Sequence, residues 1–199
     1  MKLGILGGTF DPIHNGHLFL AEEARVQFKL DRVIVIPNGT PPHKERTHLT
    51  SPKHRLEMVK RAVAGNSSLV FSDIEALKPT VSYTFDTLCR LKQSYTEATL
   101  HYIIGADAMA EFLTWHRHEE LIGMARFLCA SRPGHDLDEL KERLPAPYLE
   151  QIDHLSNMKL DISSTELRER LHKGAAVRYL LPDTVLEYIN RCKLYGTRE

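Results

Sequence analysis

Short apolar runs alternate along the chain with longer segments in which apolar residues recur every three or four positions. An apolar run between turn residues is typical of a buried strand, whereas the longer spacing marks one face of a helix. Regular alternation of the two indicates a parallel sheet with crossover helices. The pattern therefore predicts an α/β fold, a doubly wound parallel sheet of the Rossmann-like type, in which ligands bind over the carboxyl ends of the strands.

The apolar pattern also predicts where each element begins and ends. The expected strands are Lys2–Leu6, Arg32–Pro37, Val70–Ile74, Thr99–Ile104, Arg126–Ser131 and a short one near Lys159–Ile162. The expected helices are His14–Phe28, Pro52–Val63, Tyr83–Gln93, Ala108–Leu113, Glu119–Met124, Asp136–Arg143, Ser164–His172 and Pro182–Arg191.

Local turn and cap residues refine this pattern. Ser51 before Pro52 predicts a capped helix start, and Lys173-Gly174 predicts the end of the helix that begins at Ser164. Pro145-Ala146-Pro147 predicts a turn or local linker. Because no repeat or shift in composition marks a boundary, we expect one domain over residues 1–199. Residues from about 160 onward should form a C-terminal helical segment packed on the same sheet.

Composition narrows the classes of protein. The 199 residues are 42% hydrophobic and carry 26 basic and 26 acidic side chains, so the overall charge offers no case for a nucleic-acid or membrane partner. No apolar run approaches the roughly 20 residues that span a bilayer, so we expect a cytoplasmic protein. The 3 cysteines are widely spaced and predict core packing rather than disulfides or a zinc site.

The segment Gly7–Leu18 (GGTFDPIHNGHL) carries the strongest chemical signal, since it joins an apolar run directly to two glycines and two histidines. Glycines allow a sharp turn and close approach of a ligand, and a helix start presents unpaired N–H groups to an anion. His14 and His17 are three residues apart, which places both imidazoles on one face of the first helical turn. This spacing predicts a phosphate site, although surface or capping histidines are the alternative. For Asp11 the alternative is a structural role, in which its carboxylate holds the turn.

Two further segments could likewise be either ordinary structure or part of a ligand site. Ile162–Thr165 followed by Arg168 is a common helix cap, but its hydroxyls, N–H groups and guanidinium also suit phosphate oxygens. Arg170 is offset from Arg168 and should point elsewhere. The proline-rich loop Pro37–Lys44 follows a strand, so it is either a connector or a loop beside the ligand.

Gly7–Leu18 resembles the GTFDPxHxGH signature of the nucleotidyltransferase superfamily, and three more segments narrow the resemblance. Pro41–Lys44, Ser82–Leu88 and Ile162–Arg168 look like the corresponding motifs of the bacterial nicotinate mononucleotide adenylyltransferases. The four motifs occur in order and the likeness extends over almost the whole chain. It implies adenylyl transfer from ATP to nicotinate mononucleotide, which gives nicotinate adenine dinucleotide and pyrophosphate in NAD biosynthesis, with Mg²⁺ on the ATP.

The resemblance also implies residue roles. His14, His17 and Arg168 would be catalytic. The implied ATP-binding residues are Gly8, Thr9, Phe10, His14, Gly16, His17, Ile162, Ser163, Ser164, Thr165 and Arg168. The implied mononucleotide-binding residues are Gly7, Asn38, Lys44, Thr84, Gly105, Asp107, Trp115, His116 and Arg132.

Some of these positions have structural alternatives, and one departs from the family. Ser82 and Asp107 could be helix caps, and Trp115 could be a core residue. In the family, backbone N–H groups at Thr84 and at the residue after Trp115 recognise the pyridine carboxylate while the tryptophan stacks on the ring. That residue is His116 here, where Tyr or Lys is expected, which leaves the preference for nicotinate over nicotinamide open.

Other functions are weighed against this one. A pantetheine-phosphate adenylyltransferase shares the first and last motifs but is not expected to carry the two between them. An aminoacyl-tRNA synthetase of class I would be longer and would carry a Lys-Met-Ser-Lys-Ser loop. A kinase of the Walker type is disfavoured because the sequence contains no Walker motif. A nucleotide-binding regulator without catalysis stays open, as does a homo-oligomer.

Overall fold

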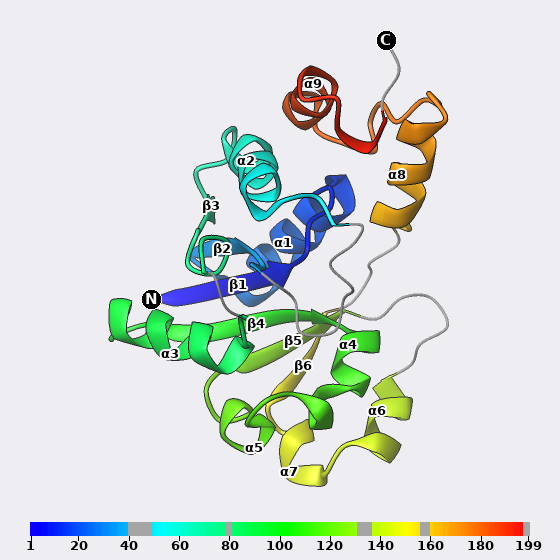
Figure 1. The fold of residues 1–199 in the computed structure, drawn as a ribbon. Coiled ribbons are helices and arrows are strands. Elements are labelled where there is room, and N and C mark those ends of the chain that lie inside the picture. Colours follow the sequence, from blue (N-terminus) through cyan, green and yellow to red (C-terminus); the bar gives the residue numbers. More distant parts are fainter. Residues whose placement is uncertain (40–48, 79–80, 131–136, 156–159, 197–199) are drawn as a thin grey trace.

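The computed structural model describes residues 1–39, 49–78, 81–130, 137–155 and 160–196 (Figure 1). Its centre is a parallel sheet of β1 (Lys2–Gly8), β2 (Arg32–Pro37), β3 (Leu69–Phe71), β4 (Thr99–Gly105), β5 (Arg126–Ala130) and β6 (Ile152–Leu155). The strand order is β3-β2-β1-β4-β5-β6. The chain adds strands on one side of β1 and then, from β4 onward, on the other side. This order confirms the doubly wound fold and puts the switch point, where such folds bind ligands, between β1 and β4.

Helices cover both faces of the sheet. They are α1 (Asn15–Phe28), α2 (Pro52–Val63), α3 (Thr84–Ser94), α4 (Ala106–Ala110), α5 (His118–Leu121), α6 (Leu137–Arg143), α7 (Ala146–Leu149), α8 (Ser164–His172) and α9 (Asp183–Arg191). Two short 3-10 helices, η2 (Phe112–Thr114) and η3 (Leu194–Gly196), complete the described elements.

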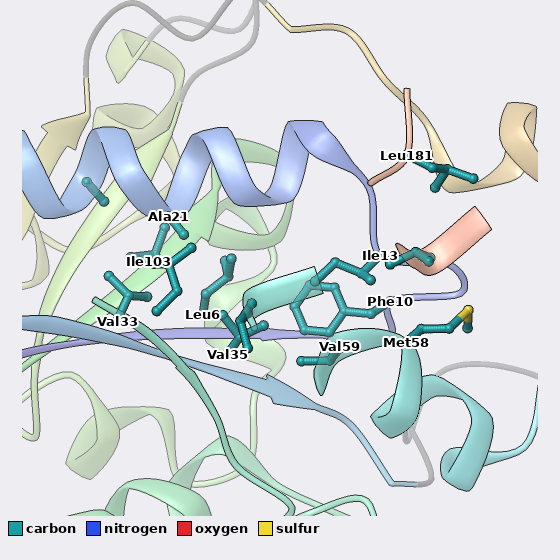
Figure 2. Packing of buried hydrophobic residues seen from close by; sticks show 14 of the residues in the cluster. Leu6, Phe10, Ile13, Ala21, Val33, Val35, Met58, Val59, Ile103 and Leu181 are labelled. Atoms are coloured by element: carbon teal, nitrogen blue, oxygen red, sulfur yellow. The ribbon is translucent and has the colours of Figure 1, made fainter. Parts of the chain in front are cut away.

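Two apolar clusters form because successive strand residues point to opposite faces of the sheet. Leu6 and Ile103 pack with α1, α2, α8 and α9, whereas Ile5 and Tyr102 pack with α3, α4 and α5 on the other face. Figure 2 shows the first cluster, with Phe10 beside Met58. Phe10, in the loop after β1, is therefore anchored in the same apolar layer that holds α8 and α9.

The sixth strand was predicted in the wrong place. The structure forms β6 at Ile152–Leu155, and the described part of Lys159–Ile162, beginning at Leu160, is not a strand. β6 is an edge strand in which polar Asp153 and His154 separate Ile152 from Leu155, so it lacks a continuous apolar run. Leu160 is 46% exposed, which shows that an apolar residue in this segment did not signal burial.

Smaller errors concern helix ends. The predicted helix Ala108–Leu113 starts earlier, at Ala106, and is broken at Glu111, after which η2 follows. The predicted strand Val70–Ile74 is the shorter β3, and the predicted helix Glu119–Met124 is α5, which begins at His118 and ends at Leu121. Pro145-Ala146-Pro147 is not a turn: Pro145 is the N-cap of α7, and Pro147 lies in its first turn, where proline is tolerated.

Candidate active site

The turn after β1 is built on backbone that few residues tolerate. Phe10 has a φ of 50°, and its ring is buried in the first apolar cluster. A Cβ at Gly8 would lie 2.8 Å from the Phe10 ring, so a side chain at Gly8 would displace it. The Asp11–Pro12 peptide bond is cis. The glycine and the buried ring together fix the path of the chain from β1 to α1.

The two histidines meet at the start of α1. His14 is the N-cap, with an extended φ of −144°, and its N–H donates to Nδ1 of His17 over 3.2 Å. The two imidazole rings stack with centroids 3.6 Å apart, so they lie on the same side of the helix start, as their spacing predicted. Because Nδ1 of His17 accepts a hydrogen bond, the proton of the neutral ring is on Nε2, which is then a donor. Gly16 leaves room for this arrangement, since a Cβ there would lie 3.1 Å from Nδ1 of His14.

The start of α8 is bound directly to this turn. Arg168 donates to the backbone oxygen of Asp11 over 2.8 Å, and Oγ of Ser164 donates to the backbone oxygen of Pro12 over 3.0 Å. Arg168 also donates to Oγ1 of Thr165. Arg170 instead forms an ion pair with Glu166, so it points elsewhere as predicted. The first and last motifs, far apart in sequence, therefore form one site at the N-termini of α1 and α8.

A buried arginine, Arg55 of α2, was missed by the sequence analysis. Only 1% of it is exposed, and it donates to the backbone oxygens of Thr9, Gly39 and Thr50 over 2.8, 2.7 and 3.0 Å. Burial lowers the pKa of Arg55, and the nearby Asp11 opposes that shift. Arg55 falls on the apolar face of an amphipathic helix, and a charged residue there was the available signal.

The carboxylate of Asp11 holds the turn, which is the structural alternative that the sequence offered. Oδ1 accepts from the hydroxyl of Tyr195 over 2.6 Å, and Oδ2 accepts from the N–H of Thr50 over 3.2 Å. Asp11 is 2% exposed. Burial, followed by the charge of Asp11, raises the pKa of the Tyr195 hydroxyl, which therefore stays a protonated donor. Nothing in the sequence around Tyr195 indicated this contact.

On the other side of β1, several residues that are expected to bind the mononucleotide lie around Tyr102. A Cβ at Gly7 would lie 2.8 Å from the Tyr102 hydroxyl, and the side chain of Thr84 hydrogen-bonds with Tyr102. Burial raises the pKa of Tyr102 to about 12. Trp115 is half-buried, with its ring centroid 6.2 Å from that of Tyr102 and 5.5 Å from that of Phe112.

The segment after Trp115 lies on the start of α3. The ring of His116 is 4.4 Å from that of Tyr83, and the Arg117 guanidinium lies 3.8 Å from the centre of the Phe85 ring. His116 is exposed. The His116 side chain, where the sequence departs from the family pattern, thus packs against the segment that also carries Thr84.

The ends of β2 and β4, which flank β1, place backbone groups beside the site. Asn38 follows β2, and its N–H donates to the backbone oxygen of Gly8 over 2.9 Å. Gly105 is the N-cap of α4, where a Cβ would meet nothing within 4 Å. Asp107 is exposed in the first turn of α4 and is not its cap. Similarly, α3 is capped at Tyr83 and not at Ser82.

Two expected mononucleotide residues, Lys44 and Arg132, lie outside the described residues, as does most of the proline-rich loop. The structure therefore assembles the two histidine positions, the α8 start, and the group formed by Gly7, Thr84 and Trp115.

Comparison with known proteins identifies the family of this chain. A family model for cytidylyltransferase-like proteins matches residues 5–170. A relative from Desulfitobacterium hafniense (strain Y51), named "Probable nicotinate-nucleotide adenylyltransferase", is 47% identical over 98% of this chain and 95% of its own. One of the same name from Thermoanaerobacter sp. (strain X514) is 44% identical over 100% of this chain and 96% of its own. The chain belongs to the nicotinate-nucleotide adenylyltransferase family.

A solved structure shows the same fold at lower identity. The nicotinic acid mononucleotide adenylyltransferase of Plasmodium falciparum, complexed with NaAD, superposes with a TM-score of 0.79 and 21% identity, over 99% of this chain and 98% of that one. Within the described residues, no helix has the length and apolar character needed to cross a membrane.

Proposed function

We propose that the protein transfers the adenylyl group of ATP to nicotinate mononucleotide, giving nicotinate adenine dinucleotide and pyrophosphate. The single observation that carries the proposal is that Ser164 and Arg168 join the start of α8 to the turn of residues 9–12 after β1. We call this turn the phosphate turn. The junction brings two helix N-termini and two imidazoles together near the switch point of the sheet, an arrangement that suits the phosphates of ATP. Family membership supports the choice of substrates.

The chemistry asks the protein for position and charge stabilisation. The phosphate of the mononucleotide is already ionised, so it attacks the α-phosphorus of ATP without a general base. As the bond to pyrophosphate breaks, negative charge grows on the departing oxygens. Nε2–H of His17 is a donor suited to that charge, and Arg168 can transfer its donors from the Asp11 carbonyl to phosphate oxygens. We assign His14, His17 and Arg168 as the catalytic residues.

The binding residues follow from the same geometry. We propose that ATP contacts Gly8, Thr9, Phe10, His14, Gly16, His17, Ile162, Ser163, Ser164, Thr165 and Arg168. We propose that the mononucleotide contacts Gly7, Asn38, Lys44, Thr84, Gly105, Asp107, Trp115, His116 and Arg132. The grouping of Gly7, Thr84 and Trp115 around Tyr102 supports the second set.

The described site fits a magnesium ion that enters with ATP and is held by the ATP phosphates rather than by protein side chains. Mg²⁺ prefers oxygen ligands and is commonly held through substrate phosphates. The turn offers imidazoles and N–H groups, and its carboxylate, Asp11, is directed to Tyr195 and Thr50. Bound in this way, Mg²⁺ would neutralise charge on the triphosphate. We also propose a cytoplasmic location, where ATP is available for a step of this kind.

The test is pyrophosphate release with ATP and Mg²⁺ in three parallel reactions. They contain nicotinate mononucleotide, nicotinamide mononucleotide or phosphopantetheine as the acceptor. Fast release with the first, matched by the dinucleotide mass, is the expected result, and the ratio to the second reaction measures selectivity for the acid. Release with phosphopantetheine alone, or in none of the three, contradicts the proposal.

A further inference from the structure

Tyr195 connects the C-terminal segment to the phosphate turn. It lies in η3, after α9, with a φ of 61° that few side chains adopt. Its hydroxyl donates to Oδ1 of Asp11 over 2.6 Å and lies 3.9 Å from Sδ of Met58. Such a backbone conformation costs free energy, so it persists only where several surrounding contacts hold the residue in place. The contact to Asp11 is thus a defined feature of the fold.

All three oxygens of Asp11 are held by different parts of the chain. Its backbone oxygen accepts from Arg168 of α8, Oδ2 accepts from the N–H of Thr50 before α2, and Oδ1 accepts from Tyr195. Three residues after Asp11, His14 caps α1 and stacks on His17. The orientation of Asp11 is therefore coupled to the two imidazoles and to Arg168.

The charge of Asp11 makes this orientation matter. A carboxylate beside a triphosphate site repels the ligand unless its charge is directed toward donors. The structure supplies such donors in the Tyr195 hydroxyl and the N–H of Thr50, and the charge of the buried Arg55 lies close to the carboxylate. Without the Tyr195 hydroxyl, Oδ1 would lose its donor and could compete for Arg168.

We propose that Tyr195 is a positioning residue for ATP: its hydroxyl fixes the Asp11 carboxylate and thereby leaves Arg168 and the stacked histidines available to phosphate oxygens. This inference rests on the proposed function of the same site, and it assigns a role to a residue outside all four motifs. The role is exerted through Asp11, and Tyr195 itself does not contact the substrate.

The deciding variant is Tyr195→Phe, which removes one oxygen atom and keeps the ring. We expect kcat/KM for ATP to fall about tenfold, as for loss of a hydrogen bond to a charged group. The KM for nicotinate mononucleotide should stay within about twofold, since its site lies on the other side of β1. Equal effects on the two substrates, or unchanged ATP kinetics, would overturn the proposal.

Tyr188→Phe is the matched control. Tyr188 is also largely buried, and its hydroxyl hydrogen-bonds with Nδ1 of His54 in α2 over 2.8 Å, but no bond joins it to Asp11. We expect this variant to lose thermal stability to a similar degree while its ATP kinetics stay within about twofold of wild type. If Tyr188→Phe weakens ATP kinetics as much as Tyr195→Phe does, the effect is a general one on stability and the inference is wrong.

A binding measurement separates this inference from the proposed activity. If the wild-type protein releases no pyrophosphate, the activity proposal fails, but calorimetry with an α,β-methylene analogue of ATP still tests Tyr195. Binding about tenfold weaker in Tyr195→Phe than in wild type and in Tyr188→Phe supports the positioning role. Equal affinities in the three proteins overturn it.

Discussion

His17 has two tasks that can be separated by experiment. Its Nδ1 accepts the N–H of His14, and its Nε2–H is the donor proposed for the departing phosphate oxygens. We expect His17→Ala to lower turnover by about two orders of magnitude or more, as loss of a transition-state donor does. Steady-state kinetics measures the effect.

Circular dichroism is the accompanying control for this variant. The lost cap contact costs about 1 kcal/mol, so the spectrum should be unchanged at 25 °C. Full activity in His17→Ala would remove His17 from the mechanism.

Trp115 tests the placement of the mononucleotide. Its ring is half-buried beside Tyr102 and Phe112, within the group that also holds Gly7 and Thr84. We expect Trp115→Ala to raise the KM for nicotinate mononucleotide by about tenfold or more, because a stacking surface is lost. The KM for ATP should change little, and equal changes in both constants would show that this placement is wrong.

The residues that the sequence predicts belong to local motifs, whereas those that it misses make contacts with distant parts of the chain. His14, His17, Ser164 and Arg168 were predicted because local spacing around glycines and hydroxyls identifies a helix start. Tyr195 and Tyr102 contact residues distant in the chain, and no local sequence pattern records such contacts. Arg55 was the intermediate case, since its place on an apolar helix face was visible.

Burial of a titratable residue within β4 links stability to pH. His101 is 6% exposed, and burial lowers its pKa, helped by the charges of Lys2 and Arg126, while Thr99 and Asp153 oppose the shift. The unfolded chain therefore binds a proton more readily than the folded one below a pH of about 6.5. We expect the free energy of unfolding to decrease as the pH falls through this range.

Urea unfolding from pH 7.5 to 5 measures this contribution in wild type and in His101→Asn. The variant should show a shallower loss of stability toward low pH, because its amide does not titrate. His172→Asn, at an exposed histidine outside the sheet, is the control and should follow the wild-type slope. Identical slopes for wild type and His101→Asn would contradict the assignment.

The loop after β2 depends on a glycine for a close approach. A Cβ at Gly39 would lie 2.3 Å from the backbone oxygen of Glu75, which cannot move as a flexible side chain can. We expect Gly39→Ala to reduce the free energy of unfolding by about 1–3 kcal/mol, the usual cost of overpacking. Gly65→Ala, where a Cβ meets nothing within 4 Å, should change it by less than about 0.5 kcal/mol. Denaturant unfolding of both variants checks the difference.

Elements with a clear apolar pattern were predicted well, and those at the edges were not. β2, α2 and α8 have the predicted bounds because a buried strand and amphipathic helices carry strong periodic signals. β6 was misplaced because an edge strand is held by the backbone and by the Arg126–Asp153 pair as much as by apolar burial. The short α4, η2 and α5 follow one another too closely for periodicity to separate them.

We propose that the chain acts as one nucleotidyltransferase domain, because both apolar clusters are built on the same sheet and α8 and α9 share a cluster with α1. Leu88 in α3 and Ile189 in α9 are fully buried on opposite faces. We expect Leu88→Ala and Ile189→Ala each to cost about 2–5 kcal/mol.

Each variant should still unfold in one transition. The single tryptophan, Trp115, packs against the second cluster, so its fluorescence reports the face opposite to Ile189. The unfolding midpoint measured by Trp115 fluorescence should match the one measured by circular dichroism in both variants. Separate midpoints for Ile189→Ala would show that the two faces unfold independently.

The contact between Tyr195 and Asp11 also bears on the order in which the protein is made. A ribosome releases the phosphate turn early and Tyr195 only after α9 has been synthesised, so a nascent chain carries the histidines long before Asp11 receives its last donor. If Tyr195 positions Asp11 as proposed, the nucleotide site reaches its final form only once synthesis has passed residue 195. A chain terminated within α9 would then retain the motif sequences but lack the completed site.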